Sequence, residues 1–182
     1  MNVLVDLQKK LFHLAKGNDL ILHQKDLFTL MGRADSSASR MLLVRAVAAG
    51  IVQNPTKGLY VFSASMRLNP DSIYKIARKL RSGYFNYLSL ESVLSQSGLI
   101  PQLPIDRITI MTTGRSQVFE LHGIGVVEFI HTKKSMDALA PNLVWDQDIE
   151  MFRASPEYAL RDLKRVGRNL DMIQESDEHD HT

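Results

Sequence analysis

The stretch Ser36–Phe62 constrains the fold more than any other part of the chain. A short helix-forming run ends at Gly50, and two apolar runs then flank a turn that contains Pro55 and Gly58. This pattern is typical of a helix followed by a β-hairpin. Because two further helical patterns precede it, the order of elements predicts a winged helix-turn-helix domain over residues 1–66.

Apolar residues at spacings of three and four predict the two preceding helices. The first helix has its apolar positions at Leu4, Leu7, Leu11 and Leu14. The second has Leu27, Leu30 and Met31, and Gly32 ends it. In the third helix, which Asp35 or Ser36 can cap, steps of 100° per residue predict an inner face made of Ala38, Leu42, Ala46 and Ala49.

The opposite face of the third helix is the predicted DNA-reading surface, and it consists of Ser36, Ser37, Arg40 and Val44. An arginine can read guanine with two hydrogen bonds, a serine can bond to a base or a phosphate, and a valine can touch a thymine methyl group. The hairpin strands are expected at Ile51–Gln53 and Leu59–Phe62, which leaves Lys57 at the wing tip for a phosphate.

Further basic residues complete the predicted interface: Arg33 before the third helix, and Lys75, Arg78 and Lys79 on one face of a helix that begins at Asn69-Pro70-Asp71. Two alternatives stay open. A basic helix face is often only solvated, and winged-helix units also serve as protein-interaction domains. Charge favours DNA, because residues 1–66 carry eight Lys/Arg against four Asp/Glu, whereas residues 136–182 carry five against eleven.

Composition excludes several classes of protein. The chain has no cysteine, which rules out disulfides, thiol catalysis and Cys-based zinc sites, and which fits a cytoplasmic location. Charges interrupt the N-terminal apolar run, so it is not a signal peptide, and no apolar run has the roughly 20 residues of a membrane helix. We therefore expect no membrane contact.

Residues 67–170 predict a second, α+β domain. Its expected elements are a helix after a short extended run in Tyr84–Ile100, three strands at Arg107–Thr112, Gln117–Leu121 and Gly125–His131, a loop at Lys133–Asp146, a strand near Ile149–Arg153, and a helix from Ser155 to about Leu170. The three strands predict an antiparallel meander with flanking helices. Residues 171–182 contain five acids in twelve positions and predict a flexible tail.

No catalytic constellation emerges, so we expect no enzyme, no metal and no cofactor. The turn Thr112–Ser116 offers hydroxyl groups and Arg115 for an anion, but it lacks the glycine spacing and lysine of a phosphate loop. A structural turn is the competing interpretation. His122 and His131 lie near the same strands without a third ligand.

The second domain resembles the AbiEi family of antitoxins. The similarity lies in residues 71–102, in Ile108–Leu121 with its Thr-Thr-Gly-Arg run at 112–115, and in Phe152–Asp162 with its Ala-Ser-Pro-Glu run at 154–157. Val93 departs from the usual alanine, and the chain ends about 25 residues after the Ser-Pro-Glu helix start, whereas many members continue into a larger helical region.

The resemblance implies two functions. The winged helix would bind inverted repeats of double-stranded DNA in its own promoter and repress the operon. The second domain would counteract a nucleotidyltransferase-like toxin, with or without a stable complex. The alternative is a stand-alone transcriptional regulator whose second domain senses a ligand near Thr113–Ser116.

Overall fold

The computed structural model describes residues 2–102 and 106–173, and the chain divides into two compact units. The first comprises Met1–Leu80 with Glu120–Gly125, and the second comprises Arg81–Phe119 with Val126–Thr182. Helices and sheets occur together, which confirms the predicted α+β class. The helix that begins near Asn69 is counted with the first unit, so the units divide after residue 80, whereas we predicted a boundary after residue 66. Most of the predicted acidic tail, residues 174–182, lies outside the described residues.

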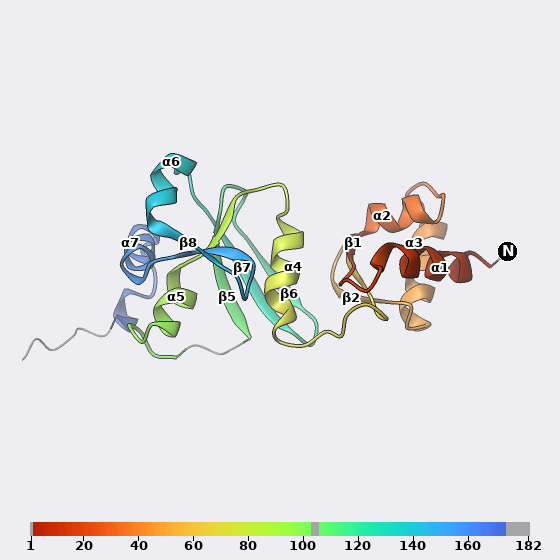
Figure 1. The fold of residues 1–182 in the computed structure, drawn as a ribbon, viewed down its shortest axis with the longest axis horizontal. Helices are drawn as coiled ribbons and strands as arrows, with labels where there is room; N and C mark the ends of the chain where they lie inside the picture. The colour runs from red at the N-terminus through yellow and green to blue at the C-terminus, as the bar shows by residue number, and fades with distance from the viewer. Residues whose placement is uncertain (1, 103–105, 174–182) are drawn as a thin grey trace, which may run out of the picture. The chain divides into compact units, whose positions relative to one another are not determined.

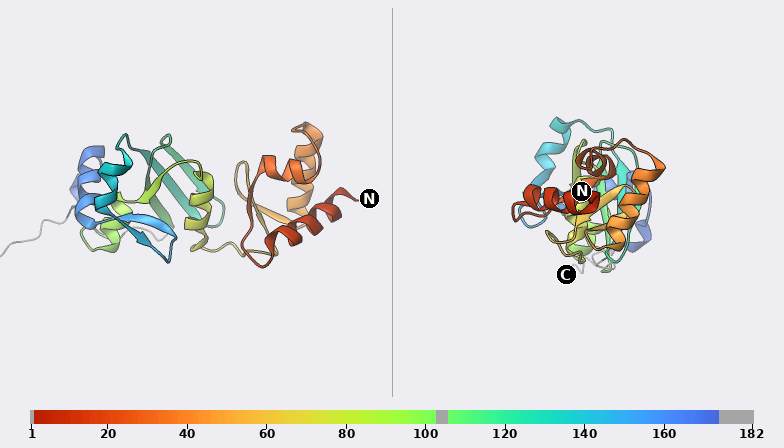
Figure 2. Two further views of the ribbon diagram at one scale, coloured as in Figure 1. Left: turned by 45° about the horizontal axis from the view of Figure 1, so that its top comes forward. Right: turned by 90° about the vertical axis from the view of Figure 1, so that its right-hand side faces the viewer.

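The first unit contains four helices and a three-stranded antiparallel sheet (Figures 1 and 2). Its elements are α1 (Val3–Ala15), β1 (Ile21–His23), α2 (Gln24–Leu30), α3 (Ser37–Ala48), β2 (Val52–Thr56), β3 (Leu59–Phe62) and α4 (Ser72–Leu80). The strand order is β1-β3-β2. The sequence did not suggest β1, because a three-residue strand is too short to show alternation.

The core of this unit brings α1, α2, α3 and the sheet together. Its fully buried side chains include Leu7, Leu11, Leu27, Leu43 and Phe62. Two details of the predicted helix faces were wrong. Leu14 is 48% exposed, and Ala15 is buried instead.

The inner face of α3 is displaced from the one predicted. Ser39, Leu43 and Ala46 are the buried residues, whereas Ala38 and Ala49 are exposed. A serine can lie in this core because the Ser39 hydroxyl donates to the Ala34 carbonyl at 2.8 Å. Apolar spacing alone could not reveal a polar residue on the buried face.

The hairpin is tighter than predicted. β2 extends to Thr56, so only Lys57 and Gly58 form the turn. Pro55 is tolerated inside β2 because the pairing with β3 shifts register between Gln53 and Thr56. The Asn54 side-chain amide donates to the carbonyls of Thr56 and Leu59, at 2.7 and 2.6 Å, and fixes this irregular stretch.

The second unit is built on a six-stranded mixed sheet (Figure 1). Its elements are β4 (Asn86–Leu88), α5 (Leu90–Gln96), β5 (Arg107–Thr112), β6 (Gln117–Leu121), β7 (Gly125–His131), α6 (Met136–Leu139), the 3-10 helix η1 (Ala140–Asn142), β8 (Leu143–Asp146), β9 (Met151–Ala154), α7 (Pro156–Val166) and the 3-10 helix η2 (Leu170–Met172). The strand order is β6-β7-β5-β4-β9-β8.

The predicted antiparallel meander was wrong in its order, although its three strands have the predicted bounds. β7 pairs with β5 in parallel and separates it from β6, which forms an edge of the sheet. Alternation along a strand is the same whichever neighbour it has, so the pattern could not distinguish these arrangements. All of 108–112 in β5 is buried, as expected for a central strand covered on both faces.

Helices α5 and α7 pack against each other, with α5 also against β5 and α7 against β9, so they cover one face of the sheet (Figure 2). The loop predicted at Lys133–Asp146 instead contains α6, η1 and the edge strand β8. These elements of three or four residues are too short to leave a periodic pattern. No helix in the described ranges is long and apolar enough to span a membrane.

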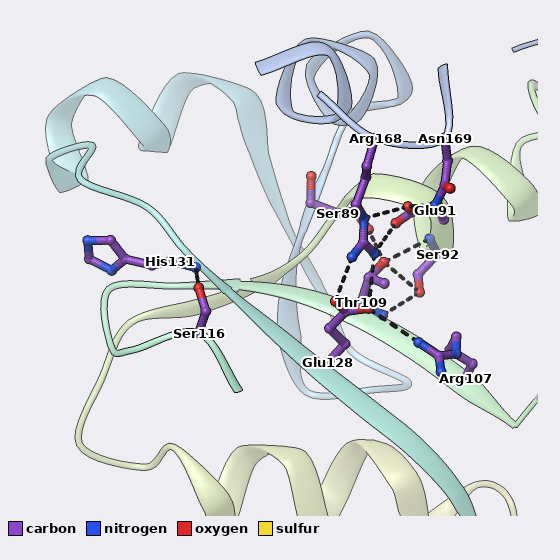
Figure 3. A network of polar contacts seen from close by, with 10 residues as sticks. All are labelled: Ser89, Glu91, Ser92, Arg107, Thr109, Ser116, Glu128, His131, Arg168 and Asn169. Atoms are coloured by element: carbon purple, nitrogen blue, oxygen red, sulfur yellow. Dashed lines mark hydrogen bonds and ion pairs between the residues drawn. The ribbon is translucent and has the colours of Figure 1, made fainter. Parts of the chain in front are cut away.

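A network of charged groups joins the segment after α7 to the sheet and to α5 (Figure 3). The Arg168 guanidinium donates to both carboxylate oxygens of Glu91, at 2.8 and 3.0 Å, and also to the carboxylate of Glu128. Asn169 donates a further bond to Glu91 at 2.6 Å, and Arg107 approaches Glu128 at 3.3 Å. The Glu91 side chain is only 3% exposed, so its charge depends on these partners.

Burial acts to raise the pKa of Glu91, but the hydrogen bonds from Arg168, the backbone and Asn169 outweigh burial, so the net pKa lies below its ordinary value. Glu91 therefore stabilises the fold above the unfolded pKa of about 4.3, and this contribution is lost as pH falls through the lowered folded pKa. We expect Glu91→Gln to reduce the free energy of unfolding by about 2–3 kcal/mol at pH 7 and to flatten its decline in acid.

Denaturant unfolding followed by Trp145 fluorescence measures this effect in the second unit, because Trp145 is the single tryptophan of the chain and lies in β8. Glu120→Gln, which removes an exposed carboxylate, is the control. Equal acid sensitivity in Glu91→Gln and in the unmodified chain would contradict the assignment.

Candidate nucleic-acid interface

The start of α3 is fixed by the residues that precede it. Ser36 has extended backbone angles and caps the helix, since its hydroxyl oxygen accepts the Ser39 backbone N–H at 3.1 Å. The same oxygen lies 2.9 Å from the Ser39 hydroxyl. Ser36 was predicted to face DNA; it is exposed, but its hydroxyl is already engaged within the chain. Its main contribution is therefore to hold the first turn of α3.

An exposed ridge runs along α3, formed by residues spaced four, three and four apart: Ser37, Met41, Val44 and Ala48. Val44 is 60% exposed and Met41 is 52% exposed, so the ridge is largely apolar. Ser37 and Val44 were predicted to face outward, and Met41 was missed. Helix spacing could have indicated Met41, because it lies three residues before Val44 and four after Ser37.

Arg40 lies beside this ridge and is held by Asp35. The Asp35 carboxylate accepts from Nε of Arg40 at 2.8 Å and from Nη2 at 3.1 Å. Both side chains are more than half exposed. A surface ion pair of this kind adds little stability, but a carboxylate on one edge of the guanidinium limits its rotation. Asp35 does not use the N–H groups of Nη1 or the second N–H of Nη2, so these donors are free to bind another acceptor.

The β2–β3 turn is attached to the beginning of α2. The Gln24 backbone N–H donates to the Gly58 carbonyl at 2.9 Å. A depression of about 330 Å³ lies here, lined by His23, Gln24, Lys25, Phe28, Asp35 and Gly58. Lys25 and Lys57 are both exposed around it, so the turn and α2 together present positive charge. Lys57 was predicted as a phosphate contact from the sequence, and Lys25 was not.

The basic residues of α4 are placed differently. Lys75 forms an ion pair with Asp19, two residues before β1, and Arg78 and Lys79 are half-buried. α4 contacts β1, whereas α3 contacts β2 at the opposite edge of the sheet. Lys75, Arg78 and Lys79 therefore form a basic group separate from the α3 ridge. Arg33 is exposed in the turn before α3.

Charge is concentrated in the unit that carries α3. The first unit has twelve Lys/Arg against six Asp/Glu, and the second has ten against fourteen. A net charge of +6 on a unit of this size favours contact with a polyanion. His122 and His131, considered as metal ligands from the sequence, fall in different units, and the described residues contain no group of three or more potential metal ligands.

No protein-family model matches the chain, and no curated protein matches it either.

The two serines at the start of α3 give a matched pair of variants. We expect Ser36→Ala to destabilise the first turn of α3 by about 1 kcal/mol, because it removes the acceptor of the Ser39 N–H. Ser37→Ala removes an exposed hydroxyl and should leave the helix unchanged. Hydrogen–deuterium exchange of a peptide spanning residues 36–48 compares them, and equal exchange in both variants would contradict a capping role.

Proposed function

We propose that the chain binds double-stranded DNA sequence-specifically through a winged helix-turn-helix, with α3 in the major groove. The observation that carries this proposal is the exposed ridge of α3, flanked by an arginine whose guanidinium a neighbouring carboxylate orients. The order α1-β1-α2-α3-β2-β3 is the order expected of this class of domain. The positive charge of the first unit supports it further.

The ridge offers different chemistry for different bases. Arg40 can present Nη1 and Nη2 to O6 and N7 of a guanine, while Asp35 holds the other edge of the fork. Val44 and Met41 suit the methyl groups of thymines, and Ser37 can bond to a base edge or a phosphate.

Phosphate contacts are assigned to the basic residues around the ridge. Lys25, which lines the depression near Gly58, and Lys57, the residue before Gly58, would meet one strand, and Arg33 would meet the backbone at the start of α3. We still predict that Lys75, Arg78 and Lys79 contact DNA, but outside the segment of the duplex that α3 would read.

We further propose that the protein is a cytoplasmic antitoxin that represses its own operon at inverted repeats and counteracts a nucleotidyltransferase-like toxin. This proposal is supported by contacts between the sequence motifs that resemble the AbiEi family, because these motifs meet within the second unit. Ser89, from the Ser-Leu-Glu-Ser run, bonds to Asp162 of the final helix at 2.9 Å, and Glu91 joins the Arg168 network. Neutralisation through a stable complex is not required by this proposal.

Replacing Arg40 tests base reading. We expect Arg40→Ala to weaken binding to a duplex selected by the full chain from a random library by tenfold or more, because the guanine contact is lost. Binding to unselected duplex should change much less. Fluorescence anisotropy measures both, and Lys9→Ala, which removes one exposed charge from α1, is the control. Unchanged discrimination between the two duplexes would remove Arg40 from the recognition face.

Replacing Lys57 tests phosphate contact. Lys57→Ala should weaken binding to selected and unselected duplexes by the same factor, since a phosphate contact carries no base information. The slope of log affinity against log salt concentration should become shallower by about one. A loss confined to the selected duplex would place Lys57 at a base instead.

Co-expression with the neighbouring gene tests the antitoxin proposal. We expect the neighbouring product to arrest growth alone and the full chain to restore growth. Arg40→Ala should still rescue growth while it derepresses the promoter. A neighbouring product that is harmless alone would favour the alternative, a stand-alone regulator with a ligand-sensing second unit.

A further inference from the structure

The second unit has an open pocket of about 450 Å³ at the turn between β5 and β6. It is lined by Tyr84, Thr113, Gly114, Arg115, Ser116 and His131. The volume lies in the range of small-molecule sites. None of the six lining residues is acidic, so no lining side chain carries a negative charge that would repel an anion.

Both hydroxyl groups of the pocket accept a backbone N–H and keep their own proton to donate. The Thr113 hydroxyl oxygen accepts the Phe85 backbone N–H at 3.1 Å, and the Ser116 hydroxyl oxygen accepts the His131 backbone N–H at 2.9 Å (Figure 3 shows the second pair). Within the described ranges, neither hydroxyl proton has a hydrogen-bond acceptor of its own. Each hydroxyl can therefore donate to a ligand, which favours a ligand rich in acceptor oxygens.

Arg115 adds a charge that the protein does not neutralise. Its side chain is exposed and makes no ion pair with any residue in the described part of the chain. Its backbone is fixed, because Nη2 of Arg81 donates to the Arg115 carbonyl at 3.2 Å. A guanidinium next to two donor hydroxyls is suited to a phosphate group.

Tyr84 supplies an aromatic surface beside these donors. A Cβ atom added at Gly114 would lie 3.0–3.2 Å from three atoms of the Tyr84 ring, so the ring rests directly on the glycine backbone. The Arg81 guanidinium lies 6.0 Å from the ring centre and helps to hold it. Tyr84 nevertheless remains 52% exposed, which leaves part of the ring for stacking against a flat ligand.

His131 completes the wall. Its Nδ1 lies 2.7 Å from the Gly114 carbonyl oxygen, and since a carbonyl only accepts, Nδ1 carries the proton. This contact holds the imidazole against the turn and leaves Nε2 as the remaining polar atom of the ring.

We propose that this pocket binds a free nucleotide, with its phosphates on Arg115, Ser116 and Thr113 and its base against Tyr84. The pocket offers donors for an anion and an aromatic ring for a planar group, and a nucleotide combines an anion with a planar base. The proposal does not depend on DNA binding by the first unit. It is compatible with a second unit that counteracts a toxin and with one that senses a ligand in a stand-alone regulator.

The test is calorimetric titration of the full chain with ATP, GTP, CTP and UTP, and separately with inorganic pyrophosphate. We expect Arg115→Ala to weaken binding of both nucleotide and pyrophosphate by tenfold or more. Tyr84→Leu should weaken nucleotide binding but leave pyrophosphate binding unchanged, because only the base uses the ring. Lys164→Ala, an exposed charge on α7, is the control. Unfolding followed by Trp145 fluorescence verifies that each variant is folded.

Three results would overturn the proposal. One is the absence of binding by all four nucleotides at millimolar concentration. Another is binding that Arg115→Ala leaves unchanged. The third is binding of a single-stranded oligonucleotide without binding of any mononucleotide, which would make the pocket part of a nucleic-acid surface. Loss of duplex binding in Arg40→Ala has no bearing on any of them.

Discussion

The second unit depends on one buried carboxylate, that of Asp162. The residue is fully buried, and a buried charge is tolerated only when it is paired and hydrogen-bonded. The hydroxyls of Tyr87 and Ser89 both donate to its Oδ2 at 2.9 Å, and Arg165 donates to Oδ1 at 3.1 Å. Burial and the adjacent carboxylate raise the pKa of Tyr87, which keeps this phenol a donor. Asp162 thereby fixes α7 to β4 and to the start of α5.

The same contacts hold a strained turn. Leu90, the first residue of α5, has φ of +56°, a left-handed conformation that is unfavourable for a leucine. The Ser89 carbonyl accepts from the Thr109 hydroxyl at 3.0 Å, and the Thr109 hydroxyl oxygen accepts the Ser92 N–H at 3.1 Å. The Ser89 hydroxyl also donates to Asp162, so the residues on both sides of Leu90 are held by hydrogen bonds. These bonds keep Leu90 in its unfavourable backbone conformation.

Local features could be predicted from the sequence, and long-range ones could not. The three strands Arg107–Thr112, Gln117–Leu121 and Gly125–His131 have the predicted bounds, because alternation and turns are encoded within each segment. Their order across the sheet depends on pairing between distant segments, and it was predicted wrongly. Likewise, Glu91 and Arg168 are 77 residues apart, and no spacing rule links them.

The candidate interface shows the same division. The exposed positions of Ser37, Arg40 and Val44 follow from helix geometry alone and were predicted. That Ser36 is a cap, and that Asp35 holds Arg40, depends on the backbone path into α3. Both are consequences of where the helix begins, which is the least certain part of any sequence-based prediction.

In each unit some basic residues pair with a carboxylate of that unit, and others are exposed. In the second unit, Arg107, Lys134, Arg153, Arg165 and Arg168 each pair with a carboxylate of the same unit. These charges act within the fold, and the partners restrict them to fixed positions. Arg115 is an exception beside two donor hydroxyls. In the first unit, Lys10, Arg40 and Lys75 are paired in the same way, whereas Arg33, Lys25 and Lys57 are exposed around α3. Arg33, Lys25 and Lys57 lie around α3, and Arg115 lines the pocket beside Thr113 and Ser116. These exposed charges are the ones that we assign to phosphate groups of a ligand.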